Sequence, residues 1–214
     1  MNSKNILLVV AIIAAVVAFS AFLASYSRYE RITGYASSTG MVNLTVEANI
    51  GLNFTTNRIA WGSGRVTEGL DYAYLDTAMR NATAVVNGNW TANNAGLMAE
   101  NIGNSNLTVK FSTWKNATVL LGGVAVTPAY QYNVTNNLTG SCSGAVNAGF
   151  SYGDWFDVNS SGNASLVDGT QICGNLTPYN TSNIIRMDIR LTIPRDAKTG
   201  ALGDSIILTY NTAA

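Results

Sequence analysis

The most frequent chemical feature of the chain is the triplet Asn-X-Ser/Thr with X other than Pro, which is the acceptor for N-linked sugar on the outer side of a membrane. Random order would give about 4 or 5 such triplets in a chain so rich in Asn, and the sequence has twelve. The alternative is that an Asn-rich and Thr-rich β-protein forms these triplets through composition alone. The excess favours an extracytoplasmic, glycosylated protein with acceptors at Asn43, Asn53, Asn81, Asn89, Asn106, Asn116, Asn133, Asn137, Asn159, Asn163, Asn175 and Asn180.

The two cysteines, Cys142 and Cys173, are the second candidates for chemistry. They do not form a CxxC pair, so a zinc site is not expected. In an oxidising compartment the pair predicts a disulfide, which would stabilise the fold by about 3–4 kcal/mol on the chain-entropy model. Two buried free thiols are the alternative.

Most other kinds of chemistry have little support in the sequence. Histidine is absent, which removes the commonest general base and the commonest metal ligand. There is no GxSxG elbow, and the glycine pairs do not open a phosphate-binding loop. Lys+Arg and Asp+Glu are both 12, so no excess positive charge is available for phosphates. We therefore expect no enzyme activity, no catalytic residue, no metal, no cofactor and no nucleic-acid partner.

Two weaker candidate sites remain. Asp154 and Asp157 in "YGDWFDVNSSGN" could ligate calcium, but a solvated loop explains them equally simply. Four tryptophans could form a sugar-binding platform, or could be core or subunit-contact residues; these are Trp61, Trp90, Trp114 and Trp155. The platform would make surface glycans a further partner.

An apolar segment opens the chain. Residues 6–24 contain no charge, no Pro and no Gly, and a helix of that length reaches about 28 Å, enough to cross a bilayer core. A cleaved secretory signal, an uncleaved membrane anchor and the core helix of a filament all fit this segment. The triplets downstream place the remainder of the chain outside, so we expect an extracellular or cell-surface protein exported through, or anchored in, the membrane by residues 6–24.

The rest of the chain alternates apolar and polar residues, which is typical of half-buried strands. The stretch 41–50 has apolar residues at 42, 44, 46, 48 and 50, and the stretch 183–193 has them at 185, 187, 189, 191 and 193, with Arg186, Asp188, Arg190 and Thr192 expected outward. Further strands are expected at "NLTVKF", "ATVLL", "VAVTPAYQYNV" and "DSIILTY", and a short helix at "YLDTAMRNATAVV". Many short strands with polar turns predict an antiparallel β-sandwich or jelly-roll-like head after one long hydrophobic helix.

A short polar leader with Lys4, an unbroken apolar helix and an Asn/Thr-rich β-head resemble the archaeal type IV pilins and archaellins. The resemblance implies a leader at 1–5 that a peptidase removes, a core helix at 6–33 and an extracellular β-sandwich domain at 34–214. It also implies a homopolymer whose subunits reside in the membrane during biogenesis. A weaker resemblance, carried by "AENIGNSNLTVKFS" and "IPRDAKTGALGDSIILTY", is to the paired strands of secreted β-sandwiches, including fibre proteins related to TasA and camelysin.

The function expected from these features is that of a structural subunit of a glycosylated, pilus-like extracellular filament. The alternatives are a membrane-anchored surface or adhesin module and a biofilm-fibre subunit assembled by strand donation. Residues 37–54 follow the helix directly, after a linker of small and polar residues. Their strand can pair within its own sandwich or reach the sheet edge of a neighbouring subunit.

Overall fold

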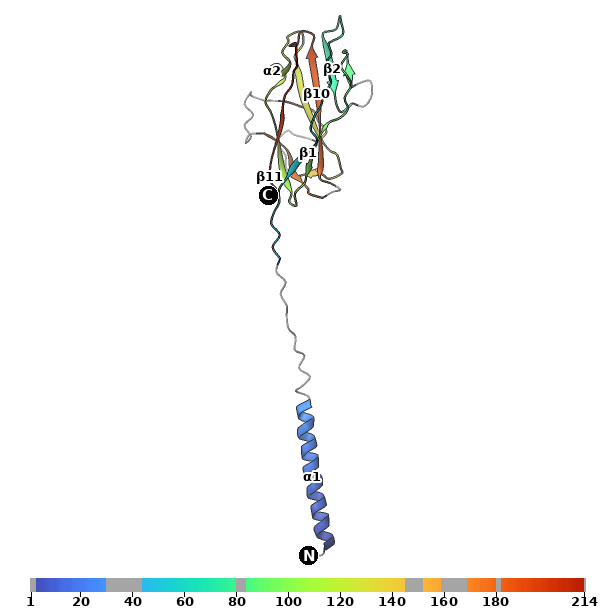
Figure 1. Ribbon diagram of the computed structural model, residues 1–214, viewed down its shortest axis with the longest axis vertical. Coiled ribbons are helices and arrows are strands. Elements are labelled where there is room, and N and C mark those ends of the chain that lie inside the picture. Colours follow the sequence, from blue (N-terminus) through green and yellow to red (C-terminus); the bar gives the residue numbers. More distant parts are fainter. Residues whose placement is uncertain are drawn as a thin grey trace. The chain divides into compact units, whose positions relative to one another are not determined.

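The computed structural model describes residues 3–29, 44–79, 84–144, 152–158, 169–179 and 182–213. The chain forms two units, Met1–Val46 and Glu47–Ala214. The first contains one long helix, and the second is a mainly β head (Figure 1). The expected fold class, an antiparallel β-rich head after an N-terminal apolar helix, is confirmed.

Helix α1 spans Ser3–Tyr29, and its segment from Ile6 to Leu23 carries apolar side chains around the whole circumference rather than along one stripe. The most apolar 18-residue stretch within its segment Ser3–Ala24 has a mean hydropathy of 3.1, and in the described part of the chain α1 is the one helix long and apolar enough to cross a membrane. A signal sequence would have the same properties, so length and composition alone do not distinguish the interpretations.

The head contains two antiparallel sheets. The larger sheet has seven strands: β1 (Leu52–Thr56), β2 (Tyr72–Asp76), β3 (Val85–Val86), β4 (Leu97–Asn101), β6 (Ala129–Asn136), β8 (Phe156–Asp157) and β10 (Ile184–Pro194). The smaller sheet has the order β11-β5-β9-β7, with β5 at Leu107–Thr113, β7 at Cys142–Ser143, β9 at Thr170–Leu176 and β11 at Ile206–Thr212. A short helix, α2 (Ala117–Leu121), follows β5.

Strand β10 organises the larger sheet. One of its edges pairs along most of its length with β6, and its other edge pairs first with β4 and then with β2. Its alternate residues, 185 to 193, are buried as the sequence predicted, because they face the smaller sheet across the core. The rings of Phe111 on β5 and Tyr132 on β6 stack at 4.2 Å between centroids, which joins the two layers.

Three expectations about secondary structure were wrong. Residues 44–50 form no strand, although they are part of the stretch predicted as one, and the first strand begins at Leu52; residues 41–43 lie outside the described residues. "ATVLL" is helix α2, because the Asn116 side chain accepts a hydrogen bond from the Val119 amide at its N-cap and Gly122 ends it at a φ of 65°. "YLDTAMRNATAVV" contains the end of β2 and all of β3, since pairing with β10 overrides its helical pattern; residues 80–83 lie outside the described residues.

The two stretches that resemble paired strands do not form hairpins. The first runs from β4 in the larger sheet to β5 in the smaller one, and the second runs from the end of β10 to β11. Each therefore connects the two layers of the sandwich, and their strands find partners elsewhere in the chain.

Candidate assembly surfaces

Helix α1 presents an apolar surface of aliphatic and aromatic side chains. From Ile6 to Leu23, its large hydrophobic side chains are about half to two-thirds exposed on all sides of the helix. Burying one such side chain is worth about 1.5–3 kcal/mol, so a surface of this kind requires an apolar cover. Lipid supplies such a cover, and so do copies of the same helix.

A second exposed apolar surface lies on residues 44–50. Leu44 is 84% exposed, Val46 is 73% exposed and Ile50 is 42% exposed. No strand ladder in the described part of the chain includes this segment. Its alternating pattern is that of a strand, yet these apolar side chains remain in contact with solvent.

One backbone edge of this segment is nevertheless held by the β4–β5 loop. The Asn49 amide donates to Asn104 Oδ1 at 2.6 Å, and the Asn104 amide donates back to the Asn49 carbonyl at 2.9 Å. Asn104 Nδ2 also donates to the Glu47 carbonyl at 3.0 Å, and the Ile102 amide donates to the Gly51 carbonyl at 3.0 Å. The contacts use residues 47, 49 and 51, so the backbone groups of 46, 48 and 50 face the other way.

In the described part of the head, two strands of more than two residues lie at the end of a sheet and have a neighbouring strand on one side only. Strand β11 pairs with β5 along one side, and β1 pairs with β4 along one side. The other edge strands, β3, β7 and β8, have two residues each. Edge strands present unpaired N–H and C=O groups and attract strand addition unless they are covered.

The structure describes seven of the twelve predicted acceptors. Four are exposed, namely Asn53, Asn89, Asn106 and Asn137, while Asn116 and Asn175 are half-buried and Asn133 is buried. The remaining five, Asn43, Asn81, Asn159, Asn163 and Asn180, lie outside the described residues. Asn53 lies on the edge strand β1, whose free side is therefore beside a predicted sugar site.

Asn133 does not offer its amide in the folded chain. It is 6% exposed, and its Nδ2, the atom that would carry the sugar, donates to the Gly153 carbonyl at 2.6 Å. Asn116 uses its side-chain oxygen as the N-cap of α2. Sequence could not distinguish these acceptors, because the triplet is the same in a core strand and in a loop.

We expect glycosylation to follow this exposure. The intact mass should exceed the 22.6 kDa of the bare chain and should fall after chemical deglycosylation. Peptide mapping by mass spectrometry should find sugar at several of Asn53, Asn89, Asn106 and Asn137, and none at Asn133. A mass equal to that of the bare chain, or sugar at Asn133 with the exposed acceptors empty, would contradict this prediction.

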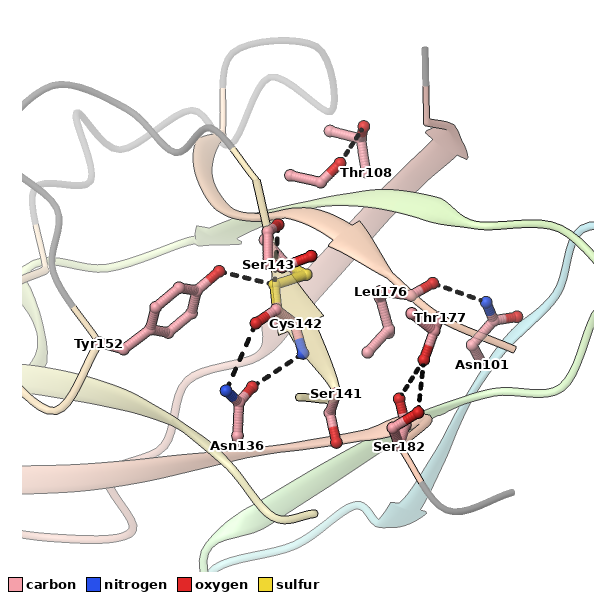
Figure 2. Close-up of a disulfide and its surroundings, with 12 residues drawn as sticks. Asn101, Thr108, Asn136, Ser141, Cys142, Ser143, Tyr152, Leu176, Thr177 and Ser182 are labelled. Atoms are coloured by element: carbon pink, nitrogen blue, oxygen red, sulfur yellow. Dashed lines mark hydrogen bonds between the residues drawn. A yellow bond between two sulfur atoms is a disulfide. The ribbon is translucent and has the colours of Figure 1, made fainter. Parts of the chain in front are cut away.

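The structure links Cys142 on β7 to Cys173 on β9, in agreement with the expected disulfide (Figure 2). The two Cα atoms are 5.7 Å apart, and both residues are buried. The Asn136 side chain accepts from the Cys142 amide at 2.9 Å and so holds β7 against the end of β6. The bridge fastens the short edge of the smaller sheet and is typical of an oxidising, extracellular environment.

Two buried ion pairs were not anticipated from the sequence. Asp188 was expected outward, but it is buried and receives hydrogen bonds from Arg186 Nη2 at 2.7 Å and from Thr77 Oγ1 at 2.8 Å. Asp76 is fully buried and accepts from Arg190 Nη2 at 3.0 Å. The sequence placed Arg186, Asp188 and Arg190 on the outer face of β10, and the segments around residues 77 and 94 cover that face.

These ion pairs are surrounded by close contacts. The Arg190 guanidinium lies 3.8 Å from the centroid of the Trp155 ring, a cation–π contact. The hydrogen bonds that Arg186 donates to the Asp188 carboxylate raise the pKa of Arg186 above its ordinary value. A Cβ at Gly96 would lie 2.7 Å from Asp188 Oδ1, so only glycine fits beside this pair. We interpret the cluster as structural, because its charges satisfy one another.

The weaker candidates do not come together as sites. Asp157 accepts from Gln131 Nε2 at 3.0 Å, and no group of three His, Cys, Asp or Glu side chains suited to a metal is found among the described residues. Trp61 and Trp90 pack against the core, Trp155 covers Arg190, and Trp114 is about half exposed. Of these four rings, all in the described part of the head, Trp114 alone is exposed, so they do not present one exposed platform.

Comparison of the chain with protein-family models, with curated proteins and with solved structures finds no match. The interpretation of the surfaces therefore depends on their physical chemistry.

Proposed function

We propose that this chain is the structural subunit of a glycosylated extracellular filament that polymerises through its N-terminal apolar helix. The observation that carries the proposal is the apolar surface of α1, which extends around the helix and has no polar face. A helix that is hydrophobic on all sides is stable only when it is surrounded, either by lipid or by other helices. In the proposed cycle, lipid surrounds it before assembly and copies of α1 surround it afterwards.

The head fits an extracellular role. Its disulfide suits an oxidising compartment, and four of its described acceptor triplets are exposed. Its buried charges are paired with one another, and its composition has no histidine. The proposed role is accordingly structural rather than enzymatic, and the proposed partner is a second copy of the chain.

A membrane-anchored surface module is the second candidate. It is favoured by the length and hydropathy of Ser3–Ala24, which would suffice for a permanent anchor. The two candidates differ in what covers α1 in the mature protein, because an anchor keeps lipid around it and a filament replaces lipid with protein.

Electron microscopy of cells that express the full chain tests the proposal. A gold-labelled antibody against the head should decorate filaments along their length, at regular intervals and not only at one end. Label confined to the cell envelope, on cells without filaments, would favour the membrane anchor and would overturn the filament.

A further inference from the structure

We propose that residues 44–50 of one subunit add as an extra antiparallel strand to the free edge of β11 in a second copy of this chain. The inference rests on the proposed filament and specifies a second contact within it, between heads. In the rest of this subsection, the donor segment is residues 44–50 and the acceptor edge is the outer side of β11.

The donor segment has the features of a strand that lacks a partner. Leu44, Val46 and Ile50 lie on its apolar face and remain exposed. Its backbone edge at residues 47, 49 and 51 is fastened to the loop around Asn104, which keeps it extended. The other backbone edge, at 46, 48 and 50, forms no ladder in the described part of the chain.

The acceptor edge has matching features. Residue 213 pairs with Asn106 through an amide-to-carbonyl bond of 2.8 Å, which continues the β11–β5 register. In an antiparallel pair, the backbone N–H and C=O groups of successive residues point alternately toward the partner strand and away from it. Residues 207, 209 and 211 therefore bond to β5, and the backbone groups of residues 206, 208, 210 and 212 point to the free edge. Those outward groups have no ladder partner among the described strands.

The core is also incompletely covered at this edge. Ile206, Leu208 and Tyr210 pack against the hydrophobic core, yet each remains only half-buried. The corresponding core-facing residues of the central strand β10 are all buried. An added strand with apolar side chains on the core-facing side would complete the burial of the edge.

The donor segment and the acceptor edge also match in which positions, odd or even, carry the free backbone groups and the apolar side chains. Strand pairing requires this match in addition to a free edge. In an antiparallel pair, residues that exchange hydrogen bonds lie directly opposite each other and have their side chains on the same face. The donor has its free backbone groups and its apolar side chains at even-numbered positions, and so does the acceptor edge. A one-residue slip would place the donor's polar side chains over the core and would be disfavoured.

The other long edge is less suitable. Strand β1 has five residues, and its exposed Asn53 is a predicted sugar site. Strand β11 has seven residues, as many as the donor segment, and its sequence "IILTYNT" contains no acceptor triplet. A sugar on Asn53 would hinder strand addition along β1, whereas the acceptor nearest to β11, Asn106, lies opposite residue 213, beyond the end of that strand.

The partner is inferred to be another copy rather than the same chain. To lie along its own β11, the donor segment would have to leave Asn104 and lose the hydrogen bonds that now hold Glu47 and Asn49. Addition to a second copy uses the opposite backbone edge and keeps these bonds. The donor segment would then join its own β4–β5 loop to the acceptor edge of the neighbouring subunit.

Two variants of the full chain test the contact by filament yield. Val46→Asp places a carboxylate on the apolar face of the donor segment, and we expect it to lower the yield of filaments at least tenfold. Asn57→Asp adds the same charge at an exposed position outside the donor segment and should leave the yield within twofold of the native chain. Equal yields from both variants, with surface delivery verified by antibody, would overturn the proposal while leaving the filament itself intact.

Cross-linking tests the same contact without adding charge. We expect a mixture of full-length Val46→Cys and Leu208→Cys subunits, assembled and then mildly oxidised, to give a disulfide between the two different chains. Ile206→Cys and Tyr210→Cys cover registers shifted by two residues, and Thr209→Cys is the control on the opposite face. A cross-link to an even position supports the proposal, and absence of a cross-link at 206, 208 and 210 overturns it. If the native chain forms no filaments, the filament proposal fails separately, and the same cross-link in concentrated full-length protein still decides whether strands are exchanged.

Discussion

Asp188→Ala should lower the free energy of unfolding of the head by about 3 kcal/mol, the low end of the range for breaking a buried ion pair. The substitution leaves the Arg186 guanidinium without its carboxylate and the Thr77 hydroxyl without its acceptor. The low end of the range applies because the Arg186 side chain is 23% exposed, so water can solvate part of the charge left behind. The Arg186 bonds to backbone carbonyls at 77 and 94 would remain but cannot neutralise it.

The Asp188 prediction can be measured by denaturant or thermal unfolding of the purified chain in detergent, followed by tryptophan fluorescence. For a domain of this size, the loss corresponds to a fall in Tm of roughly 6–12 °C. Asp71→Ala is the matched control, because it removes an Asp–Arg pair whose side chains are 62% and 63% exposed. Exposed pairs contribute at most about 1 kcal/mol, so equal shifts from the two variants would show that the Asp188 pair is not structural.

The period-two pattern was sufficient to predict β10 and its buried face, because the core side of a long central strand must be apolar. The same pattern placed Asp188 in solvent, since alternation cannot show that a second chain segment covers the outer face. Thr77, whose hydroxyl accepts from the Ile189 amide at 2.9 Å, belongs to that cover. Such contacts between distant parts of the chain leave no periodic signal in the sequence.

Residues 44–50 show a related limit of prediction from a period-two pattern. They alternate as clearly as β10 does, and the prediction of a strand in their own fold was wrong. A pattern specifies which faces a strand would have, but the pairing partner depends on which sheet edge is available. The apolar helix and the disulfide pair, in contrast, required only local composition and a count of two cysteines.

Val16→Asp should abolish filament assembly while leaving the folding of the head unchanged. Val16 lies in the middle of α1, where its side chain is 62% exposed and, in the proposed filament, packs against neighbouring helices. An unpaired carboxylate in such a dry bundle costs several kcal/mol. A cost of only about 3 kcal/mol per contact would lower each association constant roughly a hundredfold.

The control for assembly is Val16→Leu, which keeps the helix apolar and should polymerise normally. Delivery to the surface must be verified by antibody labelling of intact cells, because a charge in α1 also disfavours the membrane-bound state. Electron microscopy then counts filaments per cell for the native chain and both variants. Because α1 has no polar face, a bundle would enclose all of its sides, and the carboxylate at position 16 would lose its water. Normal filaments from delivered Val16→Asp subunits would therefore mean that α1 is not the polymerising element, and assembly would have to depend on contacts between heads.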